Sequence, residues 1–206
     1  MMSRFGAEPL EFFQNVYNDV PPWDVAAPQP ALIELINAFP PQNPILDVGC
    51  GSGDLAIGLA QLGYTAVGVD FVPTAIEQAQ AKAAALPSEV AQRLRFLVGD
   101  GLKPSLLETK FGAIVDTGFY HLFNQADTEG FIDELAQALQ PQGRYYLLAF
   151  GIEFASVNVP RAITEEEIRG RFTAERGWRV LDLQPAQFLN RVGPPVAALA
   201  ACIERI

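Results

Sequence analysis

The sequence predicts an α/β fold, in which a mainly parallel sheet carries helices on both faces. Half of the 206 residues are hydrophobic and only 18% are charged, below the roughly 25% of typical domains. This composition can bury a sizeable core and excludes a mostly disordered chain. From residue 44 onward, short apolar runs alternate with helical segments, and a glycine-rich turn follows the first run. That alternation is typical of βαβ units, and the length suits one domain over residues 1–206.

Residues 1–43 predict a helical segment in front of a core formed by residues 44–206. Apolar side chains recur at helical spacing over residues 10–20, and two prolines end this helix. A second helix, begun by Pro30, is expected over residues 31–39. No repeat or flexible linker divides the chain. We therefore expect the N-terminal segment to pack on the core and act as a lid on the substrate side.

Five short apolar runs in the core predict parallel strands. They cover residues 45–48, 65–69, 94–98, 113–115 and 144–150. Helical patterns between them cover residues 54–62, 74–86 and 128–139, and a proline–glycine turn at 141–143 precedes the fifth strand. Helices that connect parallel strands cover both faces of their sheet.

The end of the core predicts a different arrangement. Thr164 followed by Glu167 is a capping-box pattern, which predicts a short helix to about Phe172. Two runs in succession, 178–183 and 196–203, imply an antiparallel pair of strands at one edge of the sheet. The second run suits a helix about as well, because alanine favours helices.

The charge and the cysteines restrict the partners and the compartment. Acidic residues outnumber basic ones by 24 to 14, so the formal charge is −10. The basic residues are scattered, so no nucleic-acid partner is expected, and the acidity is interpreted mainly as a contribution to solubility. Two cysteines, Cys50 and Cys202, predict neither a disulfide framework nor a metal site. With no signal peptide and no apolar run of about 18 residues, we expect a cytoplasmic protein without a membrane partner; monomer and homodimer both fit.

The strongest local pattern is the turn after the first strand, Asp47-Val-Gly49-Cys50-Gly51-Ser-Gly53-Asp54. Glycines allow a tight turn there and let a ligand lie directly against the backbone. The spacing differs from the G-x-G-x-x-G of dinucleotide sites. An aspartate at the start of the next helix repels phosphate, and no Lys or Arg is near the turn in the sequence. The turn therefore favours a phosphate-free ligand, preferably a cationic one.

Two further acids follow neighbouring strands. Asp70, with Phe71 beside it, ends the second strand, where a carboxylate can accept both hydroxyls of a ribose and a ring can pack on a purine. Asp100, followed by Gly101, ends the third strand and can accept from an adenine amino group. Each acid taken alone is as often a turn residue. Because the carboxyl ends of parallel strands meet at one edge of the sheet, together they favour an adenosine-containing ligand.

In order and spacing these motifs resemble those of class I S-adenosylmethionine-dependent methyltransferases. The matching stretches lie at 47–53, 68–70, 99–100, 111–116 and 139–147. The resemblance covers about residues 44–150 strongly. It implies a Rossmann-like, doubly wound sheet of seven strands with an antiparallel C-terminal strand beside the fifth. It also implies S-adenosyl-L-methionine as cofactor, S-adenosyl-L-homocysteine as product, and no metal.

The same resemblance implies roles for individual residues. The glycine turn, including Asp47 and the backbone of Cys50, would surround the methionine part, Asp70 would bind the ribose and Asp100 would lie near the adenine. Asp116, at the end of the fourth strand, would lie beside the sulfonium and the methyl acceptor. Trp23 is a candidate aromatic contact to the cation, together with Phe119 and Tyr120.

The N-terminal segment narrows the family resemblance. Pro22-Trp23-Asp24 is similar to the start of thiopurine and halide/thiol methyltransferases, although Val25-Ala-Ala replaces the Gly-Arg that often follows. This implies methyl transfer by in-line displacement to a small acceptor: a thiol, halide, phenol or carboxylate. A NAD-dependent oxidoreductase and a non-catalytic binding module are the alternatives.

His121 is the only histidine. An unperturbed pKa near 6.5 suits a general base for a phenol or thiol acceptor, which makes His121 and Asp116 the candidate catalytic residues. A lone histidine is more often structural, and methyl transfer to thiols often needs no base.

Overall fold

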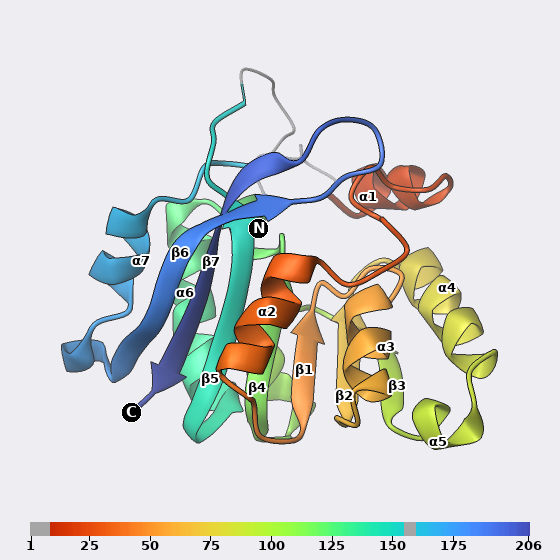
Figure 1. Ribbon diagram of the computed structural model, residues 1–206, viewed down its shortest axis with the longest axis horizontal. Helices are drawn as coiled ribbons and strands as arrows, with labels where there is room; N and C mark the ends of the chain where they lie inside the picture. The colour runs from red at the N-terminus through yellow and green to blue at the C-terminus, as the bar shows by residue number, and fades with distance from the viewer. Residues whose placement is uncertain (1–8, 155–159) are drawn as a thin grey trace.

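One seven-stranded sheet organises the protein (Figure 1). A computed structural model describes residues 9–154 and 160–206. The strand order is β3-β2-β1-β4-β5-β7-β6, and β7 is the strand that runs antiparallel to the other six. The strands are β1 (Ile45–Val48), β2 (Ala66–Asp70), β3 (Leu94–Val98), β4 (Phe111–Thr117), β5 (Leu139–Phe150), β6 (Trp178–Phe188) and β7 (Val196–Arg205). The predicted doubly wound α/β fold of seven strands is confirmed.

Residues 196–203, for which the sequence allows a strand or a helix, form the strand β7, which is inserted between β5 and β6. Its alanine-rich sequence fits a helix and a strand on propensity alone. In the sheet it pairs along its length with both neighbours; Ala201, for example, lies opposite Leu147 on one side and Leu183 on the other. Burial between two long strands, under helices, favours small apolar side chains, and residues 198–204 are all buried. Tertiary packing therefore overrides helix propensity here.

Helices cover the two faces of the sheet. They are α1 (Pro9–Tyr17), α2 (Pro30–Ala38), α3 (Asp54–Gln61), α4 (Pro73–Ala84), α5 (Ser88–Ala91), α6 (Gln125–Ala138) and α7 (Glu165–Arg171). Successive strand residues point to opposite faces, so Leu46 and Ile114 pack with α6 and α7 while Ile45 and Val115 pack with α2 and α3. The near-continuous burial of β1 and β4 follows from this double cover.

The differences from the sequence-based elements lie at the boundaries. The first helix ends at Tyr17 rather than near residue 20. Residues 141–143, predicted as a turn, lie inside β5, where a register irregularity between Phe111 and Ala113 accommodates them. β6 extends to Phe188 because β7 supplies a ladder partner as far as Val196. The short helix α5 has no strong sequence signal.

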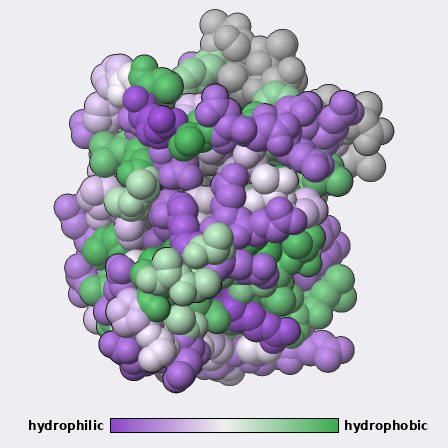
Figure 2. Space-filling view, turned by 90° about the vertical axis from the view of Figure 1, so that its right-hand side faces the viewer, coloured by the Kyte–Doolittle hydropathy of each residue, from purple (hydrophilic) through white to green (hydrophobic). Residues whose placement is uncertain are grey.

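The carboxyl ends of the parallel strands lie at the top of the molecule as drawn in Figure 1, below α1 and below the loop that joins β6 to β7. Both covering segments are remote in sequence from the strands beneath them. Figure 2 views the side with α4 and α5, where hydrophobic side chains form several separate groups among hydrophilic ones. Within the part of the chain that the structure describes, no helix is long and apolar enough to cross a membrane.

The capping box before α7 offers a test of the fold. The Thr164 hydroxyl accepts the Glu167 N–H at 3.1 Å, as the sequence predicts, and α7 anchors in the core through Ile168. We expect Thr164→Ala to lower the free energy of unfolding by about 1 kcal/mol. Thr164→Ser keeps the hydroxyl and is the matched control. Urea unfolding with the same midpoint for all three proteins would contradict this assignment.

Candidate functional site

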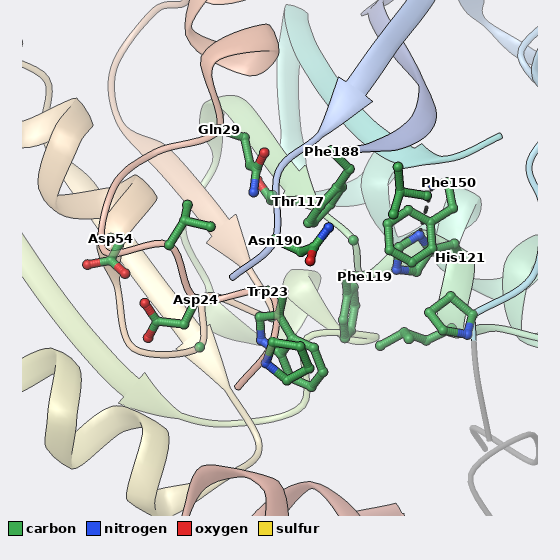
Figure 3. A pocket seen from close by; sticks show the side chains of 18 of the residues that line it. Trp23, Asp24, Gln29, Asp54, Thr117, Phe119, His121, Phe150, Phe188 and Asn190 are labelled. Carbon is green, nitrogen blue, oxygen red and sulfur yellow. Dashed lines mark hydrogen bonds between the residues drawn. The ribbon is translucent and has the colours of Figure 1, made fainter. Parts of the chain in front are cut away.

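A cavity of about 760 Å³ lies at the carboxyl ends of β1, β2 and β4. Residues of the N-terminal segment and of the β6–β7 loop complete its walls. Figure 3 shows Asp24 and Asp54 at one end, ring side chains including His121 and Phe150 at the other, and Trp23 between them. The first is called the glycine-turn end below. The second is called the aromatic end and is formed by Phe119, His121, Phe150 and Phe188.

The glycine turn is shaped by backbone conformations that side chains disfavour. Gly49, Gly51 and Gly53 all have positive φ, at 63°, 53° and 86°. A Cβ atom on Gly49 would lie 2.6 Å from the Phe119 ring, and one on Gly51 would lie 2.5 Å from the Tyr17 hydroxyl. Both conformation and space therefore require glycine. The turn exposes its backbone to the cavity, as a cradle for a ligand that contacts main-chain atoms.

Asp70 holds this turn in place. Its Oδ2 accepts the Gly51 N–H and its Oδ1 accepts the Val72 N–H, both at 2.9 Å. Burial raises the pKa of this carboxyl, and the two backbone N–H donors oppose that rise. The residue also lines the cavity, and a carboxylate has more lone pairs than the two that these backbone N–H groups use.

Asp47 is a buried acid with an unmet hydrogen bond. Its Oδ2 has no partner among the described residues, although the side chain is only 2% exposed. Burial raises its pKa well above the usual range, and the negative charges of Asp116 and Asp70 add to this. It lines the cavity beside the glycine turn. A cation bound there favours the ionised form, which relieves the cost of burying the group.

A polar cluster closes the glycine-turn end. The Ser52 hydroxyl donates to Asp24 at 2.6 Å, while the Lys82 ammonium donates to Ser52 and to Asp54, both at 2.8 Å. Burial raises the pKa of Asp24, but the hydrogen bonds from Ser52 and Ala26 and the charge of Lys82 bring it below its usual value. No basic residue is near the turn in the sequence, yet α4 brings Lys82 there, where it partly neutralises the two acids.

His121 lies at the aromatic end with one ring nitrogen bonded to the backbone. Its Nδ1 accepts the Phe150 N–H at 3.0 Å. Burial, with the charge of Arg161, lowers the pKa of His121 to about 3. The ring is neutral at physiological pH and lies 4.5 Å from the Phe150 ring, measured between centroids. This geometry favours a wall-forming role over the predicted role as general base.

Asp116 is the clearest departure from the roles that the sequence suggests. Its carboxylate is fully buried and accepts the Phe119 N–H at 2.8 Å, the Tyr120 N–H at 3.0 Å and the Tyr145 hydroxyl at 2.7 Å. Burial raises its pKa to about 7, against the effect of these donors. Its side chain is not among those that line the cavity. Asp116 instead shapes the turn that presents Phe119 and His121.

The remaining predicted residues divide into two groups. Trp23, Cys50 and Phe71 line the cavity, and the Phe13 ring contacts both Trp23 and Phe71, with centroids 6.3 and 5.7 Å away. Asp100 is exposed, accepts the Leu102 N–H and does not reach the cavity, because the turn after β3 points its side chain to solvent.

Gly101, by contrast, lies directly behind the glycine turn. A Cβ atom there would approach the Phe119 ring to 2.8 Å and the Gly49 nitrogen to 3.4 Å. It therefore supports the turn by close packing, without lining the cavity.

Sequence reasoning also missed several lining residues. Tyr17, Gln29 and Asn190 contribute to the walls. Tyr17 lies on the predicted amphipathic helix, so its apolar periodicity is a signal, but nothing local marks Gln29 or Asn190. Their positions depend on contacts between segments that are far apart in the chain.

The residues fit a cationic adenosine ligand. The glycine turn is a backbone cradle, Asp47 has an unused buried oxygen, and Asp70 faces the cavity. The cavity walls formed by described residues contain four aspartates and neither Lys nor Arg, which suits positive charge and disfavours phosphates. Within the described residues, no group of three or more His, Cys, Asp or Glu is arranged to hold a metal ion.

Comparisons with known proteins agree with this site. The model of a family described as a methyltransferase domain matches residues 45–143. The chain is 31% identical to a 2-heptyl-1-hydroxyquinolin-4(1H)-one methyltransferase of Mycobacteroides abscessus, over 81% of this chain and 72% of that protein. It is also 29% identical to a probable thiol methyltransferase of Arabidopsis thaliana, over 71% of this chain and 64% of the relative.

Solved structures extend the similarity to the whole fold. A protein studied in the conversion of a disulfide bond into a thioacetal group during echinomycin biosynthesis superimposes with a TM-score of 0.80 at 29% identity, over 95% of this chain and 92% of that one. A methyltransferase structure from Anabaena variabilis shares the fold, with a TM-score of 0.76 at 18% identity, over 96% of this chain and 93% of that one. With these matches, and with a site that disfavours the pyrophosphate of a dinucleotide, the chain belongs to the class I S-adenosylmethionine-dependent methyltransferases.

Proposed function

We propose that the protein methylates a small acceptor that carries a thiol or an acidic hydroxyl on an apolar, aromatic body. The observation that carries this proposal is the single cavity that joins the glycine turn to the aromatic end. The relatives support it, since one is named for a hydroxyquinolinone and another for thiols. A cavity enclosed by one small fold also suits a small acceptor better than a macromolecule.

For the cofactor, we propose contacts at the glycine-turn end. The backbone of residues 49–53 would hold the methionine part, with Asp47 as the nearby negative charge. Asp70 would accept the ribose hydroxyls, and Phe71 would pack on the adenine. Trp23 offers an aromatic face toward the cation, a contact worth about 1 kcal/mol. Asp100 and Asp116 are left out of this set because neither side chain lines the cavity.

When bound, the cofactor would supply a methyl group on a sulfonium, and an in-line displacement by the acceptor would break the S–CH3 bond and release the thioether S-adenosylhomocysteine. The work of the protein is then alignment and exclusion of water. Orientation of two reactants contributes about 7–11 kcal/mol in the best cases. The rings of Phe119, Phe150 and Phe188 provide rigid walls at the aromatic end, with Phe150 and Phe188 centroids 5.0 Å apart.

The aromatic end favours acceptors that ionise readily. His121, the titratable group of this end, is buried, its Nδ1 accepts a backbone N–H, and burial lowers its pKa to about 3. An acidic thiol such as thiophenol, or an acidic N-hydroxyl group, loses its proton to solvent near neutral pH and needs no base on the protein, whereas an alkyl thiol, with a pKa near 8.5, is ionised only in part. We propose, further, that residues 1–43 serve as the cover of the site, with 44–206 as the core; residues 1–8 lie outside the described residues.

An acceptor panel tests the proposed function. S-adenosylhomocysteine release would be measured with thiophenol, 2-heptyl-1-hydroxyquinolin-4(1H)-one, phenol, benzoate and iodide at pH 7.5. We expect turnover with the first two and much slower reaction with the others. Fastest turnover with iodide or benzoate would replace the proposed acceptor class. No turnover despite cofactor binding would overturn it.

Asp70 provides a test of the cofactor site. Asp70→Asn keeps the size of the side chain but removes the charge that would accept the ribose hydroxyls. Hydrogen bonds to charged groups contribute about 1.5–3 kcal/mol, so S-adenosylmethionine should bind at least about tenfold more weakly. Asp100→Asn, at an exposed strand end, is the matched control. Calorimetry with equal affinities for the two variants would contradict the placement of the ribose.

The pH dependence of His121→Gln separates a wall from a base. A general base contributes about 10²–10⁴-fold, so its loss would collapse the rate. We expect instead a kcat/KM–pH profile of unchanged shape with thiophenol.

The His121→Gln variant should also change how the stability of the fold depends on pH. The folded-state pKa of about 3 lies below the unfolded value near 6.5, so this histidine stabilises the fold above pH 6.5 and loses that contribution as the pH falls toward 3. The variant should lack that part of the acid sensitivity in thermal unfolding. If His121→Gln instead removes a rise in kcat/KM between about pH 6 and 7 that the wild-type protein shows, His121 acts as a general base.

A further inference from the structure

The rim of the cavity contains an unusual pairing between two distant segments. The Gln29 side chain donates from Nε2 to the Leu189 carbonyl at 2.9 Å, and its Oε1 accepts the Leu189 N–H at 2.8 Å. One amide side chain thus satisfies both backbone groups of one residue, as a neighbouring strand would. Gln29 is 4% exposed, so these bonds are shielded from water.

A second contact joins the same two segments nearer the surface. The Arg191 N–H donates to the Pro22 carbonyl at 2.8 Å, and its guanidinium donates to the Val20 carbonyl at 3.1 Å. The β6–β7 loop is therefore attached to the N-terminal segment at two points. Figure 1 shows this loop extending over the sheet toward α1.

Between these attachments and β7, the loop supplies apolar walls to the cavity. Val192, Pro194 and Pro195 line it, and Val192 is 78% exposed. Asn190 braces the loop internally, since it donates to the Pro194 carbonyl at 2.7 Å and accepts the Val192 N–H at 3.0 Å. These internal hydrogen bonds set the shape of the loop, and the hydrogen bonds from Gln29 and Arg191 tie it to the N-terminal segment.

We propose that Gln29 is the positioning residue that holds the β6–β7 loop over the aromatic end, and that the loop thereby selects acceptors by size. This rests on the proposed methyl transfer to a small acceptor. Both side-chain hydrogen bonds of Gln29 go to Leu189, so the side chain bonds to neither the glycine turn nor the residues of the aromatic end. Its loss should therefore affect the binding of large acceptors, which reach the loop, and spare the cofactor.

The test compares Gln29→Met with Gln187→Met. Methionine keeps the length of glutamine but cannot pair with Leu189. Gln187 lies near the end of β6, two residues before Leu189, and its side chain is exposed, so it is the matched control. We expect Gln29→Met to raise KM for 2-heptyl-1-hydroxyquinolin-4(1H)-one by about fivefold or more. KM for thiophenol, kcat, and the affinity for S-adenosylmethionine should stay within about twofold.

Amide hydrogen exchange provides a readout that needs no acceptor. The Leu189 N–H should exchange faster in Gln29→Met than in the wild type. In Gln187→Met its exchange rate should be unchanged. Arg191→Ala, at an exposed position, loosens the loop from its other attachment and should shift acceptor selectivity in the same direction.

Unchanged exchange at Leu189, or an equal rise in KM for both acceptors, would overturn the positioning role. If the wild-type protein methylates neither acceptor, the proposed function fails by itself, and the exchange data still decide whether Gln29 holds the loop.

Discussion

The site depends on one interaction, the acceptance of the Gly51 N–H by Asp70 at 2.9 Å. It joins the ends of two adjacent parallel strands, because Gly51 follows β1 and Asp70 ends β2. Three glycines at positive φ contribute no side-chain contacts to the turn, so hydrogen bonds to the neighbouring strand, from the Gly51 N–H to Asp70 and from the Cys50 N–H to the Val69 carbonyl, hold its path. The position of the cradle, and of the tyrosine and phenylalanine packed on it, follows from these bonds.

The acids at the strand ends have distinct physical roles despite their similar places in the sequence. Asp70 and Asp47 border the cavity, where negative charge suits a cationic ligand. Asp116 is buried and organises the turn after β4 through three donors, so it acts on the aromatic end only through Phe119 and His121. Asp100 faces solvent. Four of the 24 acidic residues therefore line the cavity, where their negative charge suits a cationic ligand.

The topology explains why segments from both halves of the chain meet over one cavity. Insertion of β7 beside β5 places the β6–β7 loop above the carboxyl ends of the parallel strands. The N-terminal segment crosses the same edge before β1 begins. Gln29 and Arg191 then join the two covers by hydrogen bonds. The N-terminal segment and the β6–β7 loop therefore cover the cavity, although neither contains a sequence motif that marks a ligand site.

The sequence by itself determined the α/β class, the glycine turn and Asp70, because each depends on local rules: apolar periodicity, the conformational freedom of glycine, and the meeting of strand ends at one edge. The strand or helix state of residues 196–203 and the solvent-facing Asp100 were decided by the tertiary structure. So were the approach of Lys82 to the turn and the burial of His121 with its Nδ1 bonded to the Phe150 N–H. These features depend on which groups become neighbours, and on how much water remains around them, which a linear pattern does not encode. Gln29 illustrates the limit, since its partner lies 160 positions further along the chain.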